Sequence, residues 1–104
     1  MIGHHHPQPK PPTRLLAQRL VKAWRAKQER LFLDAVWTRD ASRCRGCGRR
    51  VQRGAVELER RGEVHHRHGR NVRPEWRFAM AHAVLLCRTC HLDSAVIARF
   101  RQED

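Results

Sequence analysis

The chain has 104 residues, with 22 Lys and Arg against 10 Asp and Glu, so its formal net charge is +12 with neutral histidines. A chain this short forms a single small domain, and so basic a surface attracts polyanions such as DNA or RNA. The same charge would also suit ribosomal-type or membrane-surface proteins, so it supports nucleic-acid binding without establishing it. The longest apolar run, Ala83 to Cys87, is too short to cross a bilayer, which excludes a membrane-spanning role.

The first twelve residues contain four of the five prolines, and this composition predicts neither a helix nor a central strand. We expect residues 1–12 to form a flexible leader, and we interpret His4–His6 as part of a solvated tail. No apolar stretch followed by a small-residue cleavage site is present at the N-terminus, so the segment is not a signal peptide. The default expectation is a cytoplasmic protein.

Residues 13–38 are predicted to form a basic amphipathic helix with Thr13 as its N-cap. Apolar side chains recur within a stripe of roughly 100° on this helix, and we expect the stripe to pack on the rest of the chain. The basic side chains could form a solvated face or follow nucleic-acid phosphates, and the sequence does not separate the two. The apolar stripe consists of Leu16, Leu20, Trp24, Leu31 and Ala35; the basic set is Arg14, Arg19, Lys22, Arg25, Lys27 and Arg30.

All four cysteines fall into two C-x-x-C pairs, Cys44 with Cys47 and Cys87 with Cys90. In a reducing compartment such pairs are more typical of thiolate metal ligands than of disulfides. Four thiolates complete a tetrahedron around Zn²⁺ and leave no open position, as a structural site requires. The alternative, that the cysteines are small buried hydrophobes, fits poorly with the polar loops that hold them. The sequence therefore predicts a structural zinc site.

Between the two cysteine pairs we predict a hairpin of two short strands, Val51–Arg61 and Gly62–Arg67. The second strand carries His65 and His66, whose side chains should point to opposite faces and have different roles. A helix is predicted from His91 to Phe100, with His91 at its start, near the amide end that favours phosphate anions. The expected fold class is α+β.

The order strand, histidine pair, variable loop, Leu-Leu-Cys-x-x-Cys-His and helix resembles the HNH, or ββα-metal, endonucleases, particularly the small zinc-stapled versions of phages and prokaryotes. The resemblance covers about Arg39 to Phe100, and it implies a nuclease domain over residues 39–104. It also implies that His65 and His91 ligate a catalytic divalent ion and that His66 is the general base. Asn71–Arg77 looks like the loop of some small phage nucleases.

The chain departs from this family at one position. The family's central asparagine usually opens the segment before the second cysteine pair, where this chain has His82, and its only asparagine is Asn71. Either His82 takes the asparagine's role, which is to brace the loop and orient the general base, or the site is altered.

The resemblance implies hydrolysis of phosphodiester bonds in double-stranded DNA. The ion would polarise a phosphoryl oxygen while neutral His66 takes a proton from the attacking water. Two imidazole ligands favour Mn²⁺, Ni²⁺ or Zn²⁺ over Mg²⁺, although the family tolerates several ions. Family context suggests phage packaging proteins as further partners. Four arginines are expected to hold the scissile strand or simply to keep the surface hydrated: Arg67, Arg70, Arg73 and Arg77.

The alternative function is a non-catalytic zinc-ribbon module that binds DNA, such as a decayed nuclease or an accessory protein of packaging or transcription. The cysteines and the basic charge fit both functions equally well. Only the set His65, His66 and His91 favours the nuclease. On the alternative, these residues are surface histidines, or His91 replaces a cysteine at the zinc.

Overall fold

The computed structural model describes residues 13–68 and 76–101. It is a small α+β fold with one long helix, a two-stranded antiparallel sheet and two short helices that follow the sheet. The predicted leader, residues 1–12, lies outside the described residues, as do Arg70, Asn71 and Arg73. The elements in chain order are α1 (Arg14–Arg39), η1 (Leu58–Arg60), β1 (Gly62–His66), η3 (Met80–His82), β2 (Ala83–Cys87), α2 (Arg88–His91) and α3 (Ser94–Phe100).

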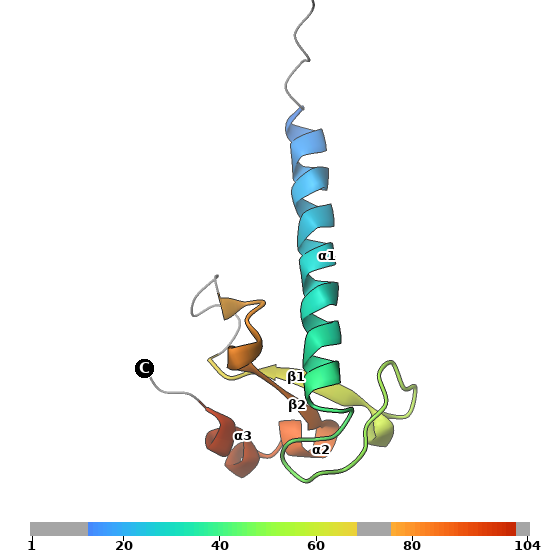
Figure 1. Ribbon diagram of the computed structural model, residues 1–104, viewed down its shortest axis with the longest axis vertical. Helices are drawn as coiled ribbons and strands as arrows, with labels where there is room; N and C mark the ends of the chain where they lie inside the picture. The colour runs from blue at the N-terminus through green and yellow to red at the C-terminus, as the bar shows by residue number, and fades with distance from the viewer. Residues whose placement is uncertain (1–12, 69–75, 102–104) are drawn as a thin grey trace, which may run out of the picture.

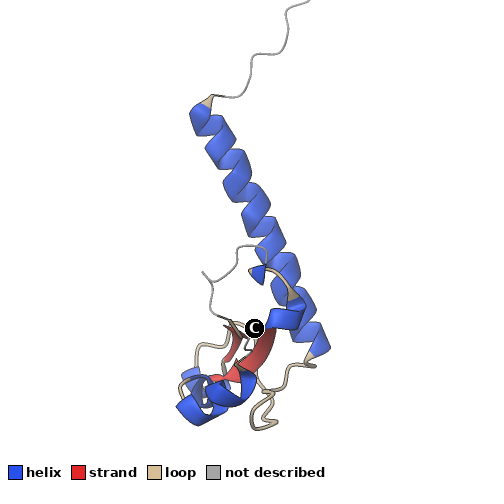
Figure 2. Ribbon diagram, turned by 90° about the vertical axis from the view of Figure 1, so that its left-hand side faces the viewer, coloured by secondary structure: helices blue, strands red, loops and turns tan. Residues whose placement is uncertain are grey.

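Helix α1 begins where the sequence predicts it, because the Thr13 side chain accepts a hydrogen bond from the amide of Leu16 at 3.2 Å. Most of the helix projects beyond the sheet and the two short helices, which we call the body (Figures 1 and 2). Only the C-terminal turns of α1 are covered, and its buried residues are Phe32, Val36 and Trp37.

The prediction that the apolar stripe of α1 packs on the rest of the chain is wrong. Leu20 and Trp24 are 57% and 58% exposed, and Leu31 is 50% exposed. At 100° per residue, Phe32 and Val36 lie roughly 120–160° around the helix from Leu20. The body therefore contacts a different side of α1, and it contacts that side only near the C-terminal end.

Strands β1 and β2 pair antiparallel, with Gly62 opposite Cys87 and His66 opposite Ala83. The predicted hairpin between Val51–Arg61 and Gly62–Arg67 is therefore wrong. The residues of β2 are all apolar and buried. Pairing β1 with β2 therefore buries far more apolar surface than pairing it with the polar segment before Gly62 would. That segment instead forms the short helix η1 and one isolated bridge, between Gln52 and Arg61, and its Val56 is exposed.

The single helix predicted from His91 to Phe100 is interrupted. Helix α2 ends at His91, and a new helix, α3, begins at Ser94 after Asp93 accepts a hydrogen bond from the amide of Ala95 at 2.9 Å. Asp is a strong N-cap residue, and this explains the interruption. His91 thus lies at the C-terminal end of α2, and the expectation that it lies at the amide end of a helix is wrong.

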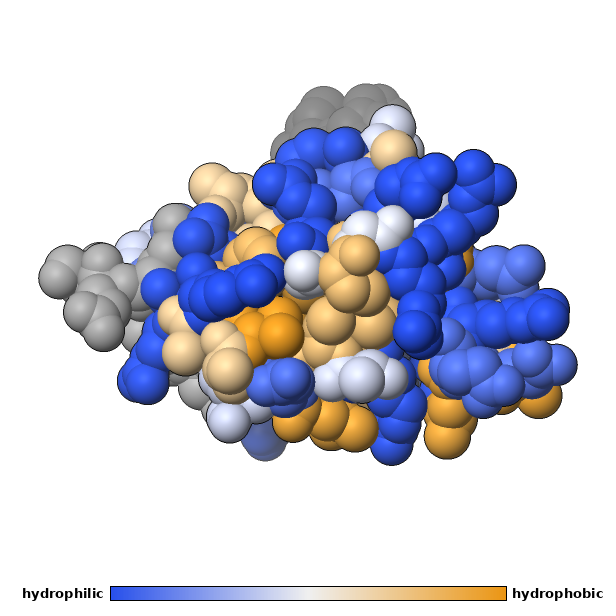
Figure 3. Space-filling view, turned by 90° about the horizontal axis from the view of Figure 1, so that it is seen from below, coloured by the Kyte–Doolittle hydropathy of each residue, from blue (hydrophilic) through white to orange (hydrophobic). Residues whose placement is uncertain are grey.

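The core lies where α1, the sheet and the cysteines meet, around Val36, Leu85 and Leu86. Gly62 allows the closest approach, since a Cβ atom at this position would come within 2.5 Å of the Trp37 ring. Seen from below, strongly hydrophilic residues surround a smaller apolar area of the surface (Figure 3). Within the described ranges, no helix combines the length and apolar character needed to cross a membrane.

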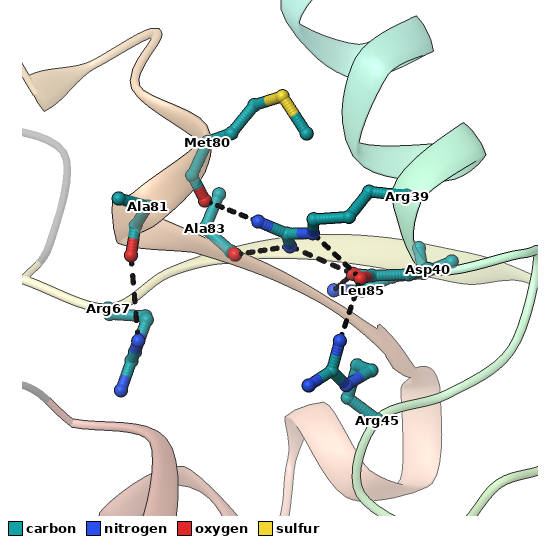
Figure 4. A network of polar contacts seen from close by, with 8 residues as sticks. All are labelled: Arg39, Asp40, Arg45, Arg67, Met80, Ala81, Ala83 and Leu85. Atoms are coloured by element: carbon teal, nitrogen blue, oxygen red, sulfur yellow. Dashed lines mark hydrogen bonds and ion pairs between the residues drawn. The ribbon is translucent and has the colours of Figure 1, made fainter.

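A buried carboxylate joins the end of α1 to β2 (Figure 4). Asp40 accepts hydrogen bonds from Arg39 Nε at 2.8 Å, from Arg45 Nη1 at 3.0 Å and from the backbone amide of Leu85 at 3.0 Å. Burial alone would raise the pKa of Asp40, but these hydrogen bonds and the two positive charges lower it overall. Arg39 also donates to the carbonyl of Ala83, so the ionised carboxylate organises the start of β2.

Candidate metal centre and histidine cluster

The two C-x-x-C pairs converge, as the sequence predicts, on one cluster that could hold a structural metal ion such as zinc. The Sγ atoms of Cys44, Cys47, Cys87 and Cys90 all lie within 4.8 Å of one another. A tetrahedron with Zn–S bonds of about 2.3 Å has S–S edges of about 3.8 Å. The Cys47 and Cys87 sulfurs are 3.8 Å apart, which fits this edge and is far longer than a disulfide bond of about 2.05 Å.

Local backbone geometry prepares the cysteine cluster for a cation. The amide of Gly46 donates to Cys44 Sγ at 3.3 Å, and the amide of Cys90 donates to Cys87 Sγ at 3.5 Å. Burial alone would raise the pKa of Cys44, but hydrogen bonds from surrounding amides lower it to about 7. Thiolate is the ligand form, so the amides around Cys44 favour metal binding there, whereas burial raises the pKa of Cys87 and Cys90 in the same cluster.

Gly46 lies so close to its neighbours in the cysteine cluster that a larger residue would not fit. A Cβ atom there would come within 3.0 Å of both the Cys90 sulfur and the Val96 side chain. The glycine between Cys44 and Cys47 therefore lets α2 and α3 pack directly over the cysteines.

A second cluster of ionisable side chains forms between β1 and the end of α2. The rings of His65 and His91 meet edge to face with centroids 5.3 Å apart, and His91 Nδ1 lies 3.1 Å from Glu63 Oε2. Arg88 Nη1 lies 3.6 Å from the other Glu63 oxygen. The structure thus brings together two of the residues that the sequence proposes as ligands of a catalytic ion. We call Glu63, His65 and His91 the histidine cluster.

His65 has the properties of a metal ligand within this cluster. Its Nε2 atom is buried and has no hydrogen-bond partner among the described residues. Burial, followed by the nearby charges of His91, His66 and Arg67, lowers the pKa of His65. The neutral imidazole that results is the form that coordinates a metal. Its unsatisfied nitrogen is costly unless a ligand occupies it.

His66 has different surroundings, in keeping with its position on the other side of β1. Its ring stacks on Phe32 of α1 with centroids 5.6 Å apart, and its Nε2 lies 3.2 Å from the carbonyl oxygen of Arg77. A carbonyl only accepts, so Nε2 carries a proton in this contact. This contact orients the imidazole.

His82 lies at the end of η3, directly before β2. Its ring stacks on Trp76 with centroids 4.3 Å apart and meets His68 edge-on at 4.9 Å. Its backbone oxygen accepts a hydrogen bond from the amide of Arg67 at 2.8 Å. His82 therefore lies opposite Arg67, one position beyond the pair that His66 forms with Ala83 in the sheet.

Two of the four predicted DNA-binding arginines lie within the described residues. Arg67 donates to the carbonyls of Phe100 at 2.7 Å and Ala81 at 3.5 Å, so it braces α3 against the start of β2. The guanidinium of Arg77 lies over the Phe78 ring at 5.5 Å. Arg70 and Arg73 lie outside the described residues.

The sequence interpretation missed Glu63 and Asp40. Glu63 precedes His65 by two residues on one strand, and residues two apart share a strand face, so this spacing was an available signal. The role of Asp40 had no comparable signal, because an acidic residue after a helix is usually solvated.

Among the described residues, only the four cysteines form a group of three or more ligand side chains close enough to hold a metal ion. The histidine cluster would supply two imidazoles, so oxygens from water and substrate would have to complete the coordination of an ion there. Comparisons with family models, curated proteins and solved structures gave no match.

Proposed function

We propose that this protein is a metal-dependent endonuclease of the HNH type that hydrolyses phosphodiester bonds of double-stranded DNA. The observation that carries the proposal is the Nε2 of His65, which is buried beside His91 and has no hydrogen-bond partner in the part of the chain that the structure describes. A chain that had only to hold a structural zinc would need no histidine cluster. The order β1, β2, α2 and the net charge of +12 also support the proposal.

Each residue would have a separate task. His65 and His91 would hold a divalent ion that polarises a phosphoryl oxygen and stabilises the leaving oxygen. Glu63, through its contact with His91 Nδ1, would orient that ring and increase its basicity. His66, whose ring the Arg77 carbonyl orients through Nε2, would take a proton from the attacking water.

His82 would act as the brace that an asparagine supplies in the family. It ends η3 directly before β2, its ring contacts Trp76 and His68, and its carbonyl accepts a hydrogen bond from the amide of Arg67, the residue after His66. With two imidazole ligands, we expect Mn²⁺, Ni²⁺ or Zn²⁺ to support cleavage better than Mg²⁺.

The alternative is a non-catalytic zinc module that binds DNA. One observation favours it: Glu63 already contacts both His91 and Arg88, and these contacts could simply brace the end of α2. On that alternative, DNA binding persists while cleavage is absent with every ion.

The test is cleavage of supercoiled plasmid by the zinc-loaded protein with Mg²⁺, Mn²⁺, Ni²⁺ or Zn²⁺ added separately. We expect cleavage with at least one ion and a loss of about 10²–10⁴-fold in the His66→Ala variant, since a general base contributes about that much. His4→Ala, which changes a histidine far from His66 in sequence, is the control and should cleave at the parent rate. A His66→Ala variant as active as the parent would remove His66 from the mechanism.

A further inference from the structure

An open groove that the histidine cluster does not use runs along one face of α1. It has a volume of about 730 Å³, and Arg77 is the residue outside α1 that lines it within the described part of the chain. Its lining combines the small apolar residues Ala17, Val21 and Ala26 with the polar and charged residues Arg14, Gln18, Lys22, Arg25, Glu29 and Arg77. Among the described residues, four cations thus line the groove with one carboxylate.

The spacing of the charges suits a polyanion. Arg14 and Arg25 are eleven residues apart, or about 16 Å along a helix. One DNA strand advances about 3.4 Å per phosphate along the duplex axis, so this stretch matches about five phosphates. Residues 14–28 contain no acidic side chain, and the first acidic residue of α1 is Glu29, so positive charge predominates along the first half of the helix.

The groove is connected to the residue proposed as general base. The Arg77 carbonyl orients His66, whereas the Arg77 side chain lines the groove. Arg77 Nε is buried without a hydrogen-bond partner among the described residues. The guanidinium as a whole carries the charge and the donors that pair with phosphate oxygens, and its side chain lines the groove.

We propose that this groove binds the phosphate backbone of the DNA that flanks the cleaved bond. The inference deepens the proposed function, since it names where the substrate is held outside the reacting phosphate. It also explains why α1 extends so far beyond the body although only its last turns are packed.

Helix α1 contains its own control. Arg14, Lys22 and Arg25 line the groove, whereas Arg19, Lys27 and Arg30 do not. Both sets contain two arginines and one lysine, and all six residues are exposed. Changing either set to glutamine removes the same charge from the same helix, so a difference between the variants reports position alone.

The experiment measures binding of a fluorescent DNA duplex to the full chain by anisotropy at several salt concentrations, with no divalent ion added. Each lost phosphate contact reduces the slope of log K against log salt by about 0.9. We expect a reduction of about 2.7 for Arg14→Gln/Lys22→Gln/Arg25→Gln and less than about 1 for Arg19→Gln/Lys27→Gln/Arg30→Gln. Thermal unfolding checks that both variants remain folded.

Equal slopes for the two triple variants would overturn the proposal, because the charges would then act only as a diffuse basic surface. Polyglutamate as competitor provides a second test. Displacement of DNA by polyglutamate at equal charge concentration, with the same dependence on the groove residues, would also overturn it in favour of an acidic protein ligand.

Failure of this inference is distinguishable from failure of the proposed function. If the parent protein never cleaves DNA but the groove variants show the expected change in slope, the groove binds DNA and the nuclease proposal is wrong. If the parent protein cleaves DNA but both triple variants have identical slopes, the nuclease proposal holds and the groove proposal is wrong.

Discussion

The cysteine cluster and the histidine cluster are neighbours, since α2 contributes Cys90 to one and His91 to the other, yet they differ in how many ligands their own side chains can offer to a metal ion. Four sulfurs with spacings suited to a tetrahedron can close around one ion and leave no vacant position. The histidine cluster has two imidazoles, one carboxylate contact and a buried nitrogen without a partner among the described residues. A closed ligand set suits a structural site, and an open one suits exchange of water and substrate.

This difference implies that the two clusters should fail in different ways when they are altered. Changes at the cysteines should affect folding first, because the body is too small to rely on its apolar core alone. Changes at the histidines should affect ion affinity or rate while the fold persists.

The largest effect is expected from Cys44→Ser or Cys90→Ser. Binding of a structural zinc is worth about 10–16 kcal/mol and is largely folding free energy, so either variant should lose zinc and unfold the body. Metal analysis and circular dichroism of the purified variants measure both outcomes. One zinc per chain with an unchanged unfolding transition in both variants would refute the four-cysteine site.

A smaller loss of stability is expected when Asp40 is replaced by alanine. The change leaves Arg39 and the Leu85 amide without their buried acceptor, and removing one partner of a buried ion pair typically costs about 3–5 kcal/mol. Asp34→Ala is the control, because its ion pair with Arg53 is exposed and should contribute about 1 kcal/mol or less. Denaturant unfolding of the zinc-loaded variants measures the difference, and equal losses would contradict this role of Asp40.

Glu63→Gln tests whether the histidine cluster binds an ion. The carboxylate contacts His91 Nδ1 at 3.1 Å, and loss of such an outer contact typically lowers metal affinity by about 10–100-fold. We expect the ion concentration for half-maximal cleavage to rise by that factor, with zinc content and unfolding unchanged. An unchanged half-maximal concentration would assign Glu63 to structural support of α2.

The smallest effect is expected at His82. If it braces the loop, His82→Asn should retain or raise the maximal cleavage rate and His82→Ala should lower it, with the ion concentration for half-maximal cleavage unchanged in both. If His82 is instead a ligand, that concentration should rise in both variants, and more for alanine. Parent-like behaviour of both variants would remove His82 from the site and make Asn71 the next residue to test.

The parts of the structure that the sequence predicts are those with local signals. The N-cap at Thr13, the helix after it and the convergence of the two cysteine pairs all depend on short spacings. The partner of β1 was mispredicted because pairing is decided by burial across the fold, and Ala83–Cys87 is the more apolar candidate. The packing of α1 was mispredicted because periodicity shows which face is apolar but not where the body contacts the helix.

The histidines show the same limit. Their sequence spacing suggested separate tasks for His65 and His66, and the two side chains do have separate surroundings. The sequence could not indicate that His65 Nε2 is buried without a partner among the described residues, or that the Arg77 carbonyl holds His66, since both depend on contacts between distant segments.

The most direct test of two clusters with different tasks is a single chelation experiment. The zinc-loaded protein is dialysed against a weak chelator, and its zinc content and plasmid cleavage are then measured on the same sample, before and after Mn²⁺ is added. We predict that one zinc per chain remains, that cleavage is lost and that Mn²⁺ restores it. Absence of cleavage with every added ion, or undiminished cleavage while one cysteine-bound zinc is the only metal left, would contradict the account.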